Sequence, residues 1–367
     1  MNKRYMVPGP FHGIVSDLPS ASDRQAFDDC LNLLCRKGRL ISRPNLNNNI
    51  SLSPDGTPIL GLRSFQDANG HYHTCAMTAT QVYDLVTHIL PPHFTWSIET
   101  NTVGSLGTRT NLPYSILNVN NRLYVANASG FLFYIEGSGT LNISGDTPGS
   151  PLFLTSNASH LIGAAWYEIT ASGNNKNFYG NKVRWSDVGN FDSWAISASS
   201  TAGVAYIQET PDTITGLTNL NTYTYITRSN GFSVMYPTGV STKPFMIEPL
   251  SVSLEGAGNY YPYSLDSNGN YFCCIAQHEI LMFDGTNWNP LGFKKAKSSI
   301  FKDINLATGP ISGKCITTFN ETFDFESYWL TIPGPNVTWI YGVEEGNWTR
   351  INSSLGALTS LAHVYLR

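Results

Sequence analysis

The pattern of apolar and polar positions divides the chain into one short helical stretch and a long series of strands. Near the N-terminus, Ser22 can cap the backbone amides of a helix, and Lys37 and Gly38 form a stop for it. The spacing predicts an amphipathic helix over Asp23–Arg36, within an N-terminal arm of residues 1–44. Its apolar stripe consists of Ala26, Phe27, Cys30, Leu31 and Leu34.

From Arg39 onward the pattern changes to short apolar or aromatic runs that are separated by Gly, Asn, Asp and Ser. This alternation is typical of strands joined by tight turns, and it predicts hairpins at six places along the chain. The predicted pairs are His71–Thr78 with Gln81–Val86, Leu123–Ala126 with Phe131–Glu136, His160–Tyr167 with Val183–Trp185, Tyr223–Thr227 with Phe232–Tyr236, Asn270–Ala276 with Glu279–Phe283, and Tyr328–Ile332 with Val337–Tyr341.

The spacing of these hairpins indicates the fold class. The middles of the first strands of successive hairpins are 40 to 61 residues apart, and a four-stranded propeller blade has roughly 40–50 residues, so loops account for the longer intervals. We therefore predict an all-β fold, a single six-bladed β-propeller over residues 45–367, following the N-terminal arm. The ring would close if Leu358–Leu366 paired with an early strand, either 39–43 or 59–65.

Two similar segments follow the fifth and sixth hairpins and support this repeat. In both, an acidic residue and a glycine precede an Asn-Trp pair, ending in Trp288 and Trp348. We expect Gly285 and Gly346 to allow the turn, and each tryptophan to begin an outer strand and pack on the next blade.

Composition and charge exclude several classes of function. Charged residues make up 13% of the chain, against about 25% in average proteins, and aromatic residues make up 12%. This suits either a surface partly covered by neighbouring subunits or one rich in Asn, Ser and Thr. The net charge of −4 and the lack of a basic stripe argue against sequence-specific nucleic-acid binding.

The sequence also predicts where the protein is made. No signal-peptide pattern precedes Pro19, and no apolar run approaches the roughly 18 residues of a membrane span, so we expect synthesis in the cytoplasm and no membrane anchor. We interpret the six cysteines, which form no C-x-x-C pair, as free thiols that lie mostly in the core.

No set of residues predicts catalysis, a metal or a cofactor. Asp187 and Asp192 are close in sequence, but a Ser-Asp and Asp-Ser context favours turns in which these side chains bond to their own backbone. His71 and His73 lie on one strand face, but no third ligand is evident nearby. We therefore predict a protein that is not an enzyme and has no catalytic, metal or cofactor residues.

One segment carries a resemblance to a known family. It reads R-W-S-D from residue 184, continues to a second tryptophan, and is followed by I-T-G-L; its marked residues are Arg184, Trp185, Ser186, Asp187, Trp194, Ile214, Gly216 and Leu217. The segment resembles the signature of podophage tail-hub (nozzle) proteins, and residues 26–45 are similar, more loosely, to the opening of that family. Asn45 departs from the family's usual glycine.

The resemblance implies a structural protein of the phage virion, assembled in the host cytoplasm. Six copies would form a homohexameric ring below the portal and adaptor proteins, extend the channel for passing double-stranded DNA without sequence-specific binding, and anchor tail fibres, spikes or a needle. The signature residues would then serve the fold or subunit contacts. We expect Arg184 to pair with Asp187, Ser186 to cap backbone amides, and Trp185 and Trp194 to bracket the loop.

Two other functions remain open at this point. The 8 tryptophans and 19 tyrosines would also suit a propeller that binds or cleaves carbohydrate. A kelch-like scaffold for protein partners would have the same architecture without forming a ring. The solution mass separates these alternatives, because only the tail hub requires six copies.

Overall fold

A computed structural model describes most of the chain between residues 33 and 352. The described residues are 33–36, 39–42, 57–79, 81–87, 94–99, 112–126, 130–136, 140–169, 176–208, 212–250, 257–291, 296–318 and 325–352.

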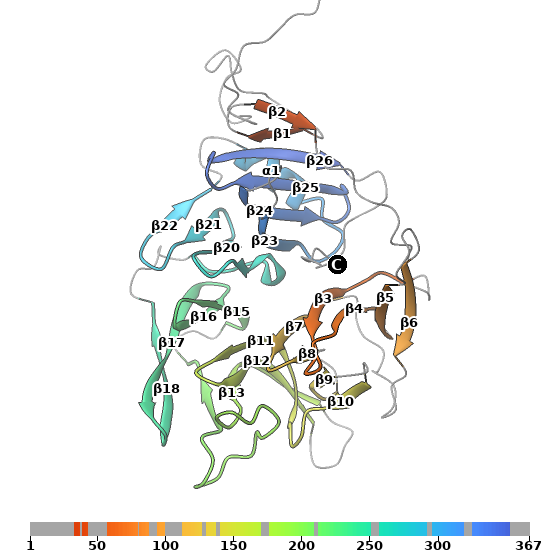
Figure 1. The fold of residues 1–367 in the computed structure, drawn as a ribbon. Helices are drawn as coiled ribbons and strands as arrows, with labels where there is room; N and C mark the ends of the chain where they lie inside the picture. The colour runs from red at the N-terminus through yellow and green to blue at the C-terminus, as the bar shows by residue number, and fades with distance from the viewer. Residues whose placement is uncertain are drawn as a thin grey trace, which may run out of the picture. The chain divides into compact units, whose positions relative to one another are not determined.

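The described chain is all-β with few helices, and its strands form six four-stranded antiparallel sheets (Figure 1). Within each sheet the strands follow one another in sequence order. The predicted fold class, a six-bladed β-propeller, is therefore confirmed. The chain divides into two compact units, with four blades in residues 47–265 and two blades in residues 266–358. The predicted boundary at residue 44 stays a prediction.

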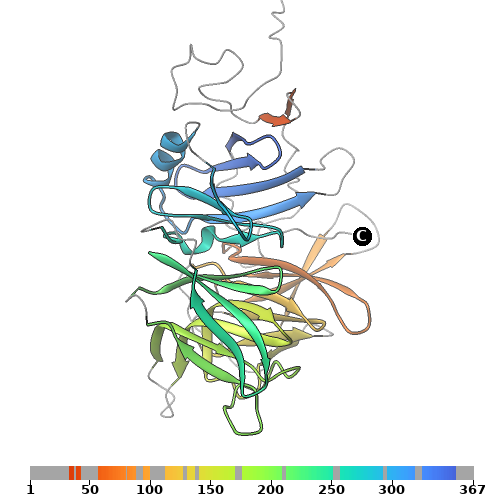
Figure 2. The same ribbon diagram turned by 90° about the vertical axis from the view of Figure 1, so that its left-hand side faces the viewer.

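The first of these units, residues 47–265, contains blades 1 to 4, whose twisted sheets are also visible in the turned view (Figure 2). A single 3₁₀ turn, Pro262–Ser264, follows the last strand. The strands are β3 Gly61–Gln66, β4 Tyr72–Met77, β5 Val82–Thr87 and β6 Phe94–Glu99 in blade 1; β7 Ser115–Val119, β8 Arg122–Ala126, β9 Phe133–Glu136 and β10 Thr140–Ile143 in blade 2; β11 Gly149–Asn157, β12 His160–Ile169, β13 Lys176–Trp185 and β14 Gly203–Tyr206 in blade 3; and β15 Ile214–Leu220, β16 Tyr223–Arg228, β17 Gly231–Val240 and β18 Lys243–Pro249 in blade 4.

The other unit contains blades 5 and 6, a two-stranded hairpin and a short helix. Its elements are β1 Leu33–Arg36 and β2 Arg39–Ser42 in the hairpin; β19 Asp266–Ser267, β20 Phe272–Ile275, β21 Ile280–Phe283 and β22 Trp288–Pro290 in blade 5; helix α1 Lys297–Ile304; and β23 Ser312–Thr318, β24 Phe325–Ile332, β25 Val337–Gly342 and β26 Asn347–Asn352 in blade 6.

All six predicted hairpins are present, and each forms the middle pair of strands in its blade. The reason lies in burial. In β8 and β20 nearly every side chain is buried, and these strands are accordingly almost continuous apolar runs. Burial varies among the outer strands: most positions of β26 are buried, whereas in β14 only half-buried and exposed positions occur.

The predicted N-terminal helix is wrong over its last four residues. Leu33–Arg36 is strand β1, which pairs with β2 in the register Leu34↔Ile41 and Cys35↔Leu40. Lys37 and Gly38, the expected helix stop, lie outside the described residues. Strand β1 also lies beside β26 of the same unit. The remainder of the predicted helix, residues 23–32, lies outside the described residues.

Helix α1 was not predicted. Ala296, Ile300 and Ile304 are buried at a spacing of four residues, which places them on one face of the helix. Asp303, on its last turn, accepts a hydrogen bond from Trp339 Nε1 at 2.9 Å and so ties the helix to blade 6. The expected closing strand, residues 358–366, lies outside the described residues.

The two Asn-Trp segments occupy the predicted places. Gly285 and Gly346 both have positive φ, at 96° and 61°, and each precedes the outer strand of its blade. The ring of Trp288 lies 4.6 Å from that of Phe283 in its own blade, and its expected packing on the next blade stays a prediction. Trp348 instead reaches the preceding blade, where its Nε1 donates to Leu291 O at 2.9 Å.

Neighbouring blades of the four-blade unit pack face to face through buried apolar side chains. Blades 1 and 2 share a cluster that includes Phe65, Met77 and Val125. Blades 3 and 4 share a second cluster around Ile162 and Ile226. A third cluster joins blades 2 and 3, and it contains two tryptophans, Trp166 and Trp194.

Candidate functional site

The signature residues lie at one junction in the four-blade unit. Arg184 and Trp185 end β13, and the chain then makes a long excursion, residues 186–202, before β14 begins. We call this excursion the signature loop. The I-T-G-L residues begin β15, the first strand of blade 4. The residues of the signature are thus divided between blades 3 and 4.

The expected pairing of Arg184 with Asp187 is wrong. Arg184 pairs with Glu168 of β12. Its Nη1 donates to Glu168 Oε1 at 2.7 Å, and Lys182 Nζ donates to the same carboxylate at 2.9 Å. Arg184 Nη2 also reaches Trp194 O at 3.5 Å. The side chain is 14% exposed, so this ion pair lies mostly within blade 3.

Asp187 instead holds the two ends of the signature loop together. Its Oδ1 accepts hydrogen bonds from the hydroxyl of Thr201 at 2.6 Å and from the backbone N–H of Thr201 at 2.8 Å. A third bond comes from Val188 N at 3.0 Å. These bonds lower the pKa of Asp187, with the Thr201 hydroxyl as the largest cause. The predicted turn role is confirmed for this residue.

Ser186 caps a backbone amide, as predicted. Its Oγ accepts a hydrogen bond from Leu161 N at 2.9 Å, and its backbone N–H donates to Leu161 O at 2.9 Å. His160 Nδ1 lies 2.6 Å from Ser186 O. Because a carbonyl oxygen only accepts, the hydrogen of this imidazole lies on Nδ1. Ser186 therefore fastens the start of the loop to β12.

The two signature tryptophans pack on different partners. Trp194 is 1% exposed, and its ring stands edge-on to Trp166 with centroids 5.2 Å apart. Trp185 faces the other way, against Phe245 of blade 4 at 5.5 Å, and donates from Nε1 to Thr201 O at 2.9 Å. They bracket the loop as expected, but each does so by joining it to a different neighbouring blade.

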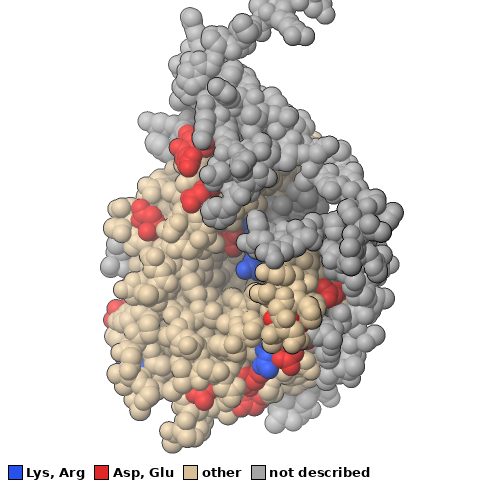
Figure 3. Space-filling model, viewed as in Figure 1, with Lys and Arg blue, Asp and Glu red and all other residues tan. Residues whose placement is uncertain are grey.

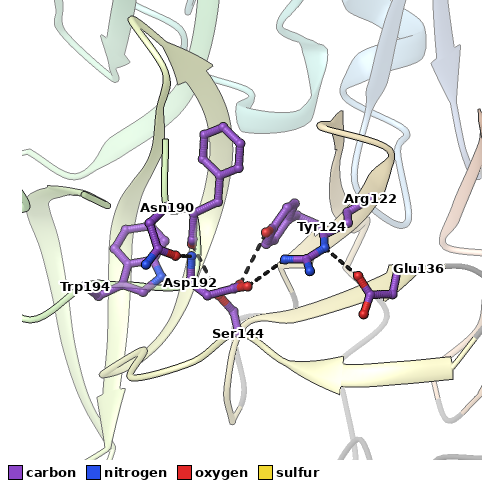
Figure 4. A network of polar contacts seen from close by, with 8 residues as sticks. Arg122, Tyr124, Glu136, Ser144, Asn190, Asp192 and Trp194 are labelled. Carbon is purple, nitrogen blue, oxygen red and sulfur yellow. Dashed lines mark hydrogen bonds and ion pairs between the residues drawn. The ribbon is translucent and has the colours of Figure 1, made fainter. Parts of the chain in front are cut away.

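Asp192, near the middle of the loop, reaches into blade 2 (Figure 4). Arg122 Nη1 donates to its Oδ2 at 2.7 Å, while Tyr124 OH and Ser144 Oγ donate to its Oδ1 at 3.3 Å and 3.0 Å. Arg122 Nε also bonds to Glu136 Oε2 at 2.6 Å. Burial raises the pKa of Tyr124, so its hydroxyl stays protonated and remains a donor. The predicted turn role is wrong for Asp192.

A second carboxylate binds the backbone of the loop. Asp146, in the turn between β10 and β11, accepts the backbone N–H groups of Trp194 and Ala195. In the same turn, Gly145 has a φ of +30°, and a Cβ at this position would lie 2.0 Å from Asp192 O. The turn and the signature loop approach each other so closely at this position that only glycine fits.

The I-T-G-L residues are part of the core. Ile214 is 1% exposed and packs in the cluster that joins blades 3 and 4, with Leu217 at its edge. At Gly216 a Cβ would lie 2.4 Å from Leu265 Cδ2 and 2.9 Å from Thr227 Oγ1. Gly216 follows a register irregularity in the pairing of β15 with β16. This part of the signature thus serves packing.

Taken together, the signature loop joins blades 2, 3 and 4. Asp187 is held by a hydroxyl and backbone amides within the loop, whereas Asp192 bonds to Arg122 of blade 2, so the two carboxylates do not form a pair for acid–base catalysis. Sequence patterns missed Arg122, Ser144 and Asp146, because these residues lie 48 to 70 residues from their loop partners. The Ser-Gly-Asp-Thr turn at 144–147 was the one local signal.

The histidines of blade 1 form a small ionic cluster. His73 Nδ1 lies 2.7 Å from Asp84 Oδ2, and its Nε2 lies 3.6 Å from Asp67 Oδ2. His71 Nδ1 lies 3.4 Å from the same Asp67 oxygen, but its side chain is 75% exposed. In the described part of the chain, no group of three or more His, Cys, Asp or Glu side chains is arranged to hold a metal ion.

This cluster predicts a pH-dependent stability. The hydrogen bond with Asp84 raises the pKa of His73 against the opposing effect of burial. The stabilisation is therefore complete below the unfolded value of about 6.5 and is lost as the pH rises through the folded pKa. In the wild type, the free energy of unfolding should fall between pH 6 and about 8.5 as His73 loses its proton. We expect this fall to be smaller in His73→Gln. Urea unfolding at each pH measures this.

The exposed neighbour gives the matched control. His71→Gln should leave the pH dependence of the unfolding free energy close to that of the wild type, because a side chain in solvent is largely screened. If the two variants behave alike, or if the wild type gains stability over this range relative to His73→Gln, the assignment to His73 is wrong.

Comparisons with known proteins give likenesses in structure only. No protein-family model and no curated protein matches the chain. A computationally designed protein, Ika8, matches with 11% identity and a TM-score of 0.42, over 86% of this chain and 93% of that one. Apo AztD from Citrobacter koseri matches with 9% identity and a TM-score of 0.43, over 81% and 75%. At these values the likenesses carry neither a family nor a function.

A third solved structure is similar at the same level. A quinoprotein alcohol dehydrogenase-like protein from Bacteroides thetaiotaomicron matches with 10% identity and a TM-score of 0.41, over 81% of this chain and 67% of that one. As for membranes, none of the helices among the described residues is long and apolar enough to span a bilayer.

Proposed function

We propose that this protein is a structural component of a tailed-phage virion, a tail hub or nozzle. Six copies would form a ring below the portal and adaptor, extend the channel for double-stranded DNA, and anchor fibres, spikes or a needle. The observation that carries the proposal is the order of residues in the signature, R-W-S-D, a second tryptophan and I-T-G-L. The fold and the site are compatible with it.

The geometry of the signature loop supports a mechanical role. The loop ties three successive blades together through ion pairs, backbone caps and buried tryptophans. Such cross-links stiffen a subunit, and a ring that carries attached fibres or spikes requires stiff subunits. The signature residues in this loop contact other parts of the same chain, so they support the fold of each subunit.

The surface supports the same proposal. On the face drawn in Figure 3, uncharged residues cover most of the described surface, and the charged side chains are scattered. Depletion of charge is typical of surfaces that lie against neighbouring proteins. Exposed apolar side chains of blades 3 and 4, including Ile196, Tyr206 and Val240, add to this character.

The solution mass and the particle shape test the proposal. We expect the purified chain, or the chain assembled on its adaptor ring, to give particles of about six times 40.3 kDa in light scattering. Negative-stain electron microscopy should show rings with a central channel. A protein that stays monomeric with and without the adaptor ring would contradict the tail-hub proposal. A carbohydrate-binding propeller or a kelch-like scaffold would then be favoured.

A further inference from the structure

A hollow of about 460 Å³ opens where three blades present their first turns. In blades 2, 3 and 4 the first two strands are joined by two-residue turns, at residues 120–121, 158–159 and 221–222. Positive φ values of 46° to 59° occur in all three turns. These turns lie side by side and form the walls, and Phe191 of the signature loop completes the lining.

The walls are fixed in place by hydrogen bonds between the blades. Asn157 Nδ2 donates to Thr222 O at 2.9 Å, and Asn219 Nδ2 donates to Ser156 O at 2.6 Å, so the turns of blades 3 and 4 are held together. Gly189 N donates to Ser159 O at 2.8 Å and holds the signature loop against the same rim. The hollow is therefore largely pre-formed, which reduces the entropy lost on binding.

The chemistry of the lining selects one class of ligand. All nine lining residues that the structure describes are uncharged. The hollow therefore has no cationic side chain to bind an anion and no carboxylate to bind a metal ion. Amides and hydroxyls dominate, and these groups both donate and accept hydrogen bonds, as a polyhydroxylated molecule requires.

Several of these polar groups are uncommitted. The side chains of Asn120, Asn221, Ser156 and Ser159 make no hydrogen bond to another described residue. Asn157 uses its Nδ2 but leaves its Oδ1 as a free acceptor among the described residues. Phe191, half-buried and edge-on to Tyr124 at 6.3 Å, gives the lining its single aromatic ring.

Turn geometry alone accounts for part of this set. Asparagine tolerates positive φ, which explains Asn120 and Asn221 as turn residues. It does not explain the convergence of free serine hydroxyls, a free amide oxygen and an aromatic ring on one fixed hollow. A neutral pyranose uses such a combination fully, since its hydroxyls bond to amides while its C–H face packs on an aromatic ring.

We propose that this hollow binds one or two residues of a neutral oligosaccharide. Contacts of this kind are few and remain partly open to solvent, so the expected dissociation constant is on the order of 1 mM. The proposal does not depend on ring formation, because all lining residues belong to one chain. A monomeric protein and a hexameric one would both carry the site.

Saturation-transfer difference NMR with the full chain tests it. The probes are maltotetraose, cellotetraose and chitotetraose, with tetragalacturonic acid as a charged comparison. We expect saturation transfer to at least one neutral probe and little to the acidic one, because no cation lines the hollow. Absence of transfer to all three neutral probes at millimolar concentration would overturn the proposal.

Glycine variants locate the binding. Asn120→Gly with Asn221→Gly removes two free amides but keeps turns that need positive φ, so the fold is retained while the affinity should fall about tenfold. Asn121→Gly is the matched control, since Asn121 has the same turn conformation at φ 58° but lies outside the lining. Binding that survives the double substitution, or that Asn121→Gly weakens equally, places the sugar elsewhere and refutes the assignment.

Discussion

Replacing Trp194 with alanine is expected to destabilise the protein by about 3–5 kcal/mol. The side chain is 1% exposed and packs among Trp166, Leu161 and Tyr124, between blades 2 and 3. Truncation removes the contact with Trp166 and leaves a cavity at the centre of the signature. Urea unfolding followed by far-ultraviolet circular dichroism measures the loss without relying on tryptophan fluorescence.

Val188 gives the control for this substitution. It lies in the same loop but is 52% exposed, so Val188→Ala should change the unfolding free energy by no more than about 0.5 kcal/mol. A loss below about 1 kcal/mol for Trp194→Ala would mean that the tryptophan does not fill the interface between the blades. The interpretation of the loop as a cross-link would then be wrong.

Replacing Gly145 with alanine should have the second large effect, about 2–4 kcal/mol. The methyl group would lie 2.0 Å from Asp192 O, a backbone atom that cannot rotate away, and overpacking of this kind costs about 1–3 kcal/mol. The positive φ of 30° adds about 1 kcal/mol of backbone strain. The unfolding midpoint in urea should therefore fall markedly.

Gly189 separates the two contributions. It also has a positive φ, at 68°, but a Cβ there meets nothing within 4 Å, so Gly189→Ala should cost only the backbone strain of about 1 kcal/mol. The additional loss of unfolding free energy in Gly145→Ala, relative to Gly189→Ala, then measures the cost of the close approach between the turn and the signature loop. Equal losses in both variants would contradict the close contact between the loop and the turn of blade 2.

The middle strands of the blades could be predicted from the sequence because their environment is uniform. Residues such as those of β8 and β20 are buried on both faces, so each strand is an almost uninterrupted apolar run next to turn residues. The edge strands have mixed environments, so their limits could not be predicted. Strand β1 was mistaken for a helix end because its pairing with β2 is decided by tertiary contacts.

The candidate site shows the same division. The bonds of Asp187 reach Val188 and Thr201 in its own loop, and the Ser-Asp context predicted this turn chemistry. The partners of Asp192 and Arg184 lie on other strands, and nothing in the neighbouring residues points to Arg122 or Glu168. A charged side chain pairs with an opposite charge that lies close to it in space, and separation along the sequence does not reveal which charge that is.

The sequence by itself determined the six-fold repeat, the all-β class and the location of the signature, since hydrophobic periodicity and turn chemistry are local properties of the chain. Only the tertiary structure decided that the signature is a cross-link of three blades, that Gly145 and Gly216 lie where two segments of the chain nearly touch, and that three turns line an uncharged hollow. These features depend on which blades become neighbours, and that is set by the packing of whole sheets.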